Sequence, residues 1–179
     1  MSETVTAPTE DAEGKSKWRF GADTASAEIR AEAAQMLVDS RVPGSTLGTL
    51  LNAFLSKHLP WPYRAGPGTA IDSTGAESSR FESVIYTSPD FVERVPADNL
   101  ACVIDIHESL SLEQLRRSYE KIAHAKTLGK AAIPTAPQGV PVADATMGII
   151  FARDSEIPIE ALAEEVARLN CQYSYRFWP

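Results

Sequence analysis

Two ionisable side chains stand close together near the end of an apolar run, in the stretch Ala101-Cys-Val-Ile-Asp-Ile-His-Glu-Ser-Leu. If this run is a β-strand, successive side chains point to opposite faces, so Asp105 and His107 share one face. Ile104 and Ile106 then share the other face. A carboxylate and an imidazole in this arrangement can bind each other, or they can cap the helix that follows. The sequence therefore predicts that the two polar groups converge on one site.

The chain carries none of the short motifs that mark several common enzyme classes. It has no Gly-rich phosphate loop, no nucleophile elbow, no Cys/His spacing of the zinc type and no internal repeat. Its two cysteines, Cys102 and Cys171, form neither a metal-ligand cluster nor a disulfide framework. Those enzyme classes therefore have no support in the sequence.

The strand that carries Asp105 is one of several that the sequence predicts. Extended segments are expected over residues 63–71, 80–86 and 100–107, joined by two antiparallel connections, and a later one over 146–152. Gly75 suits a turn that needs a positive φ. In the segment 80–86, alternation places Glu82, Val84 and Tyr86 on one face and Phe81, Ser83 and Ile85 on the other.

Helices are expected before, between and after these strands. The spacing of apolar residues predicts helices over residues 23–41, 45–58, 111–128 and 158–170. Ser111 with Gln114 makes a capping box at the start of the third helix. The last residues, CQYSYRFWP, indicate a short strand. This order is typical of an α/β (α+β) fold in which helices flank a central mixed β-sheet of about four or five strands.

Length and composition indicate one domain with a tail. A chain of 179 residues with 44% hydrophobic residues can form a real core. Residues 1–20 are acidic and rich in Ser, Thr, Ala and Pro, so we expect a disordered tail there. The single domain is expected over 21–179, with its core at about 44–170. We find no apolar run of membrane-spanning length and no secretory signal, so we expect a cytoplasmic protein with no membrane partner.

The net charge of −7 bears on the partners of this domain. A protein that binds the phosphate backbone tightly usually presents a strongly basic face, and no such face is evident from the sequence. The charge therefore disfavours nucleic acid as a partner, although a local basic patch would still allow it.

The order helix, strand, strand, strand, helix, strand resembles the αβββαβ core of the PD-(D/E)XK nuclease superfamily, the restriction-endonuclease-like fold. The stretches GSTLGTLLNAFLSKHLP, DSTGAESSRFESVIY and VIDIHESLSLEQL are similar to the motifs of an uncharacterised bacterial domain family with that fold. The motifs of that family are a helix with Gly-x-x-x-Glu that ends in Leu-Pro, then D-x-x-G-x-x-S, an Asp on the next strand, and IExKxxL before a capped helix. The resemblance covers roughly residues 44–169.

The resemblance also implies a metal site, and this chain departs from it at every position. In that superfamily a helix Glu, a strand Asp and a strand Glu hold one or two Mg²⁺ ions, and a Lys assists the attacking group. The corresponding residues here are Gly48, Glu82, Asp105 and His107. Gly48 removes one ligand, and the two retained carboxylates each differ in length by one methylene. His107 replaces a permanent cation by a shorter ring that is mostly neutral at pH 7.

Three interpretations follow from these departures. We favour a nuclease-fold domain that has lost catalysis, needs no cofactor and acts by binding or regulation. Alternatively, Glu82, Asp105 and His107 form a rebuilt catalytic site, with Glu82 and Asp105 as ligands of Mg²⁺ or Mn²⁺, or of Zn²⁺, which like Mn²⁺ accepts imidazole. In the third interpretation, Asp105 and His107 only pair or cap a helix, and the resemblance is one of layer architecture alone.

The resemblance also indicates a partner. Members of this superfamily often belong to restriction, repair or phage-defence systems, and members of the family usually continue past RFWP into a further strand. We therefore expect a protein partner or a homo-oligomer that covers a sheet edge or exposed aromatic side chains. The aromatic residues in question are Tyr173, Tyr175, Phe177 and Trp178. Their side chains can equally pack on the core of their own domain.

Overall fold

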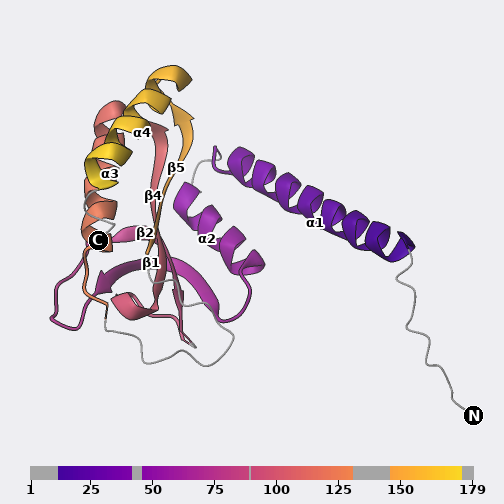
Figure 1. Ribbon diagram of the computed structural model, residues 1–179, viewed down its shortest axis with the longest axis horizontal. Coiled ribbons are helices and arrows are strands. Elements are labelled where there is room, and N and C mark those ends of the chain that lie inside the picture. The colour runs from indigo at the N-terminus through magenta and orange to yellow at the C-terminus, as the bar shows by residue number, and fades with distance from the viewer. Residues whose placement is uncertain (1–11, 42–45, 89, 131–145, 175–179) are drawn as a thin grey trace, which may run out of the picture.

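The computed structural model describes residues 12–41, 46–88, 90–130 and 146–174, with side chains from Ser26 to Tyr173 within those ranges. The chain forms a five-stranded mixed sheet with helices on both faces. In Figure 1, α2 (Leu47–His58) lies on one side of the sheet, and α3 (Leu112–Lys126) and α4 (Ile159–Ser174) lie on the other. The predicted α/β class and mixed sheet are confirmed.

The order of strands in the sheet is β3-β1-β2-β4-β5. The pairs β1–β2 and β2–β4 are antiparallel, as the sequence predicts, whereas β1–β3 and β4–β5 are parallel. Asp105 and His107 lie on β4, next to the sheet edge formed by β5. The strands are β1 (Tyr63–Ile71), β2 (Phe81–Thr87), β3 (Arg94–Pro96), β4 (Leu100–Leu110) and β5 (Met147–Ser155).

Local signals account for the elements that hold β4 in place. The turn before β2 contains Gly75 with φ 90°, and the N-terminus of α3 has the predicted capping box between Ser111 and Gln114. A short 3-10 helix, η1 (Ala97–Asn99), leads directly into β4. Strand β3 is absent from the sequence prediction because it is only three residues long and ends in a proline.

Both ends of the chain differ from the sequence prediction. Helix α1 (Ala12–Asp39) begins well before residue 23, and its first half contains no proline, the residue that most strongly disfavours a helix interior. The predicted short strand at the end is wrong for residues 171–174, which continue α4 to Ser174. The tail prediction for residues 1–11 lies outside the described residues, as do Tyr175, Phe177 and Trp178.

Tyr173, near the C-terminal end of α4, packs on its own domain. Tyr173 is half-buried against the cluster formed by Leu110, Leu115 and Leu169, and its ring centroid lies 6.0 Å from that of Tyr119. Tyr173 is therefore part of the α3–α4 layer.

Two apolar cores separate the faces of the sheet. On the α3 side, Val84, Tyr86 and Val103 pack with Ile122 and Ala125. On the α2 side, Leu51 and Met36 pack with Ile104 and, at the margin, Ile85 and Ile106. The C-terminal part of α1 closes this second core, and the rest of α1 extends away from the sheet in Figure 1. No helix among the described residues is long and apolar enough to cross a membrane.

Candidate functional site

Asp105 and His107 meet on the α3 side of β4, as their alternation with Ile104 and Ile106 predicts. His107 Nε2 lies 3.1 Å from Asp105 Oδ2. The side chain of His107 is only 16% exposed and that of Asp105 only 11%. The pairing that the sequence allows is therefore present, whereas helix capping is not, because Ser111 caps α3.

Helix α3 adds two side chains that the sequence analysis missed. The Ser118 hydroxyl donates to Asp105 Oδ2 over 2.6 Å, and Lys121 Nζ donates to Asp105 Oδ1 over 2.5 Å. Ser118 and Lys121 are three residues apart and so share the helix face that lies on β4. The Lys121 ammonium also lies 4.4 Å from the centre of the Phe81 ring, a cation–π contact. Both oxygens of the Asp105 carboxylate are therefore occupied by donors from α3.

The single proton of the Ser118 hydroxyl fixes the role of the imidazole. Because Ser118 donates that proton to Asp105, its oxygen accepts from His107 Nε2, which lies 2.8 Å away. His107 thus carries a proton on Nε2.

A Ser-His-Asp catalytic triad is excluded by this arrangement. In a triad the imidazole contacts serine and aspartate through different ring nitrogens and takes the proton of the serine. Here Nε2 contacts both partners, Ser118 donates to the carboxylate, and Ser118 is 1% exposed. The cluster is a hydrogen-bonded charge network without an available nucleophile.

The charge state of Asp105 follows from its partners. Burial alone would raise the pKa of its carboxyl group, but the hydrogen bonds from Lys121 and Ser118 and the nearby positive charge outweigh burial and lower this pKa. Asp105 is therefore a carboxylate at neutral pH, and the Lys121 ammonium neutralises it. We define Asp105, His107, Ser118 and Lys121 as the β4–α3 network.

Glu82 lies elsewhere, because a β-bulge interrupts β2. Gly66 pairs with Val84 and Gly68 with Phe81, so β2 carries one extra residue between these two pairs. As a result, Phe81 and Val84 both enter the core on the α3 side. The predicted alternation, which placed Glu82 on the face of Val84, is wrong for this reason.

The Glu82 side chain is exposed and lies beside α2. A Cβ atom on Gly48 would lie 2.6 Å from Glu82 Oε2, so the absence of a side chain at Gly48 provides the space for this carboxylate. Glu82 and Gly48 line a hollow of about 570 Å³ together with Thr49, Asn52 and Arg80. Two of the three positions that the resemblance assigns to metal ligands, Gly48 and Glu82, are thus adjacent, but one of them is a glycine.

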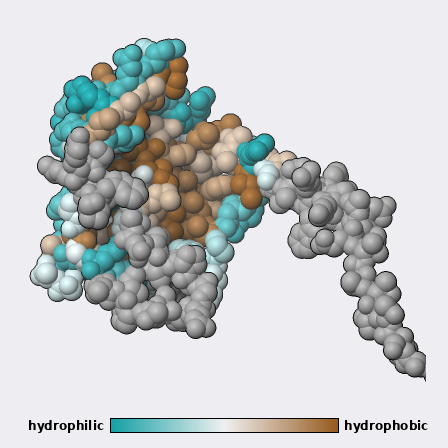
Figure 2. Space-filling view, viewed as in Figure 1, coloured by the Kyte–Doolittle hydropathy of each residue, from teal (hydrophilic) through white to brown (hydrophobic). Residues whose placement is uncertain are grey.

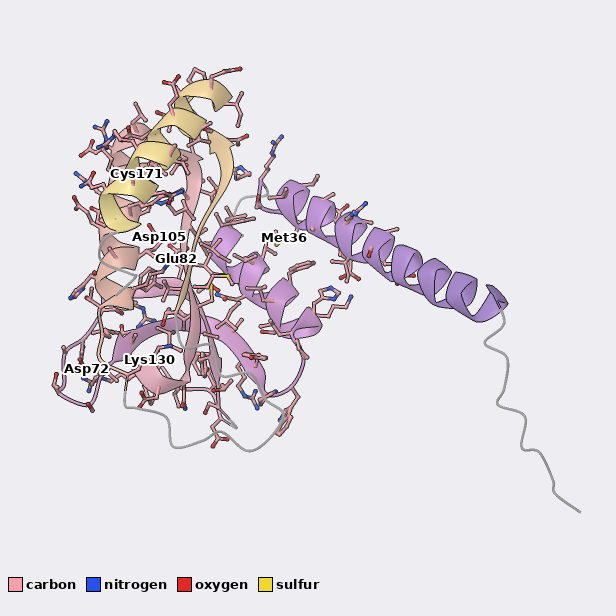
Figure 3. The ribbon with its side chains drawn as sticks, viewed as in Figure 1. Met36, Asp72, Glu82, Asp105, Lys130 and Cys171 are labelled. Carbon is pink, nitrogen blue, oxygen red and sulfur yellow. The ribbon has the colours of Figure 1, made fainter. Side chains whose placement is uncertain are left out.

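The described residues do not form a divalent metal site in this arrangement. Glu82 lies beside Gly48 of α2, whereas both carboxylate oxygens of Asp105 bind donors of α3, Lys121 and Ser118. Figure 3 labels the two acidic residues. Among residues 12–41, 46–88, 90–130 and 146–174, no three His, Cys, Asp or Glu side chains are grouped closely enough to hold a metal ion. A hard cation such as Mg²⁺ needs several oxygen ligands at near-ideal geometry. The donor set does not fit that requirement.

Solved structures with a similar fold belong to NucC, a PD-(D/E)XK-type endonuclease. The cAAA-bound form of NucC from E. coli MS115-1 superposes with a TM-score of 0.64 and 19% identity, over 80% of this chain and 66% of that chain. The chain has a nuclease-like fold. The cAAA-bound NucC of P. aeruginosa ATCC27853 gives a TM-score of 0.62 and 17% identity, over 81% of this chain and 68% of that chain. The apo form of the E. coli protein gives a TM-score of 0.59 and 21% identity, over 78% of this chain and 68% of that chain.

The nuclease-like fold is supported by structure alone. No protein-family model and no curated protein matches the sequence. The chain spans about two thirds of the NucC chains, and the identities are too low to transfer an activity. The fold implied by the resemblance in the sequence is therefore confirmed, and the activity has to be argued from the residues of the site.

Proposed function

We propose that this nuclease-fold domain has lost metal-dependent catalysis and acts as a binding or regulatory protein. The observation that carries the proposal is the contact between Lys121 and Asp105. A carboxylate that holds a divalent cation in a nuclease must present free oxygen atoms to that cation. In this chain the cation on Asp105 is an ammonium group of the protein itself.

The other departures from the nuclease pattern act in the same direction. Gly48 supplies no carboxylate, and Glu82 fills part of the space that a longer side chain on α2 would need. His107 is engaged through Nε2 by its neighbours in the β4–α3 network. Restoring a metal site would therefore require several side chains to move together.

A role in a defence or DNA-processing system is the setting that the nuclease-like fold favours. NucC is an endonuclease of CBASS defence, and two of the similar structures contain cAAA. The net charge of −7 favours a protein partner over direct contact with the phosphate backbone. The cytoplasmic location stays a prediction.

An active metal-dependent nuclease is the second candidate, and the likeness to NucC favours it. In that case Glu82, Asp105 and His107 would have to reorganise around Mg²⁺ or Mn²⁺. Lys121 would have to leave Asp105 and take the role of the cation near the attacking group. Glu82 would have to turn from α2 toward the β4 carboxylate.

A cleavage assay separates the two candidates. Purified wild-type protein and Asp105→Asn are incubated with plasmid, single-stranded DNA and RNA in the presence of Mg²⁺ or Mn²⁺. The proposal predicts that the two proteins give the same background, because any cleavage then comes from contamination. Metal-dependent cleavage by the wild type that disappears in Asp105→Asn would establish the second candidate instead.

A further inference from the structure

Strand β5 lies at one edge of the sheet. It pairs in parallel with β4 along its whole length, from Met147 opposite Cys102 to Ser155 opposite Leu110. Among the described residues, no strand pairs with its outer side. An open edge presents unpaired backbone N–H and C=O groups and is a template for another strand.

The first half of β5 lacks the features that usually protect an edge. The stretch Met147-Gly-Ile-Ile-Phe contains no charge and no proline, and it is apolar on both faces, as is typical of a strand in the interior of a sheet. Nevertheless no residue of β5 is fully buried, and Met147 and Ile149 are 61% and 36% exposed. Figure 2, which is viewed as Figure 1, shows a hydrophobic area in the middle of the molecule, over the region of β5 and α2.

The charges of β5 are confined to its other end. Arg153 binds Glu108 and Asp154 within the chain and donates to the backbone oxygen of Ser40. These contacts hold the charged end of β5 against β4 and the end of α1. The open, uncharged edge is therefore limited to residues 147–151, which we call the β5 edge.

We propose that the β5 edge pairs with the β5 edge of a second copy of this chain. The two strands run antiparallel about a twofold axis at Ile149, so that Ile149 lies opposite its own equivalent and Met147 lies opposite Phe151 of the other copy. On the other face, Ile150 of one copy meets Gly148, which has no side chain to oppose it. The two five-stranded sheets then form one continuous sheet.

The pattern of charge selects a second copy as the occupant. In this register every cross-strand pair of the β5 edge joins apolar residues or glycine, and no charge lies opposite a charge. Arg153 and Asp154 fall outside the paired stretch on both copies, where Arg153 keeps its contacts within the chain. The surface is self-complementary, as an interface with twofold symmetry must be. This inference goes beyond the proposed function and does not depend on whether the chain cleaves nucleic acid.

The first measurement is the mass of the full chain in solution by light scattering after size exclusion. The proposal predicts twice the chain mass of 19.4 kDa at high concentration. Ile149→Lys places two like charges opposite each other across the twofold axis, and Met147→Lys places a charge against Phe151 of the other copy, so each should raise the dissociation constant by at least about tenfold. Ile159→Lys is the matched control, because Ile159 is 69% exposed at the start of α4, outside the β5 edge, and this variant should remain dimeric.

A crosslink tests the register and does not depend on the charge variants. In a Cys171→Ser background, Ile149→Cys places the Cβ atoms of the two cysteines about 4.5–5.5 Å apart across the twofold axis, close enough for a disulfide to form after a small adjustment. Oxidation should give a covalent dimer. Asp154→Cys, on the same strand but far from the axis, should not crosslink.

Three results would overturn the proposal. The first is a wild-type chain that is monomeric at every concentration, as expected if another segment of the chain or a different protein covers the β5 edge. The second is a dimer that both lysine variants leave intact. The third is a dimer in which Ile149→Cys crosslinks no better than Asp154→Cys.

Discussion

Lys121 Nζ of α3 lies 2.5 Å from Asp105 Oδ1 of β4, and Ser118 binds the second oxygen of the same carboxylate. This contact joins the helix to the strand at the position where the nuclease pattern has a metal ligand. Asp105 is 11% exposed and Lys121 is 26% exposed, so both charges are partly withdrawn from water. Each charge is therefore stabilised in the folded protein by the opposite charge of its partner.

Removing the ammonium group should destabilise the fold. Lys121→Met keeps the packing over Phe81 but leaves the Asp105 carboxylate without its cation. Because the pair is only partly buried, we expect a loss of about 1–3 kcal/mol in the free energy of unfolding, measured by urea denaturation. Combining the change with Asp105→Asn should recover part of this loss.

Arg117→Met provides the control for this prediction. Arg117 lies on the same helix and binds Glu113, but both side chains are largely exposed, so its replacement should change stability by less than about 0.5 kcal/mol. Equal unfolding midpoints for wild type and Lys121→Met would show that the contact contributes nothing to stability.

Acid should weaken the protein through the same carboxylate. The folded state lowers the pKa of Asp105, so below neutral pH the unfolded chain takes up this proton before the folded chain does. The stability from Asp105 is complete above the ordinary carboxyl pKa of about 3.9 and is lost as pH falls through the lower folded value.

The measurement is the urea midpoint of wild type and Asp105→Asn between about pH 5 and pH 2. The wild-type midpoint should fall more steeply than that of the variant. Comparison with this variant is needed because other carboxyl groups contribute to the same acid range. Glu165, for example, has a pKa lowered to about 2 by Arg168 and Arg116. Parallel curves for the two proteins would show that the carboxyl group of Asp105 does not contribute to the loss of stability in acid.

A methyl group at Gly48 should be tolerated. It would approach Glu82 Oε2, the end of a flexible and exposed side chain that can turn away. Alanine also favours a helix more than glycine does, so Gly48→Ala should raise the free energy of unfolding by up to about 1 kcal/mol. The gain should be similar in a Glu82→Ala background. A clear loss of stability in either background would show that the region around Gly48 and Glu82 is more tightly held than the contacts indicate.

The same change at Gly148 should have the opposite effect. A Cβ atom there would lie 2.2 Å from Ile122 Cγ2, inside the layer between β5 and α3. Gly148→Ala should therefore cost about 1–3 kcal/mol in thermal or urea unfolding. Ile122→Ala should remove most of that additional cost, because it removes the opposing atom. An unaffected Gly148→Ala protein would mean that α3 and β5 are less closely packed.

The sequence predicted the features that depend on short-range signals. The bounds of β1, the positive φ of Gly75 and the capping box of α3 follow from residues within a few positions of each other. The convergence of Asp105 and His107 follows from strand alternation alone. These patterns need no knowledge of the tertiary arrangement.

The rest of the site depends on tertiary contacts. The bulge that turns Glu82 toward α2 arises from the pairing of β1 with β2, and simple alternation does not predict it. Ser118 and Lys121 acquire their role only when α3 packs on β4. A polar Ser118 between the apolar Leu115 and Ile122 of the same helix face is the one local signal that could have indicated it.

A calorimetric titration of the purified protein with Mn²⁺ tests directly which cation neutralises Asp105. The proposed neutralisation by Lys121 predicts no stoichiometric heat from the wild type and the same trace from Asp105→Asn and Glu82→Gln. Saturable binding by the wild type that disappears in Asp105→Asn would contradict it, since the carboxylate would then prefer a divalent ion to Lys121.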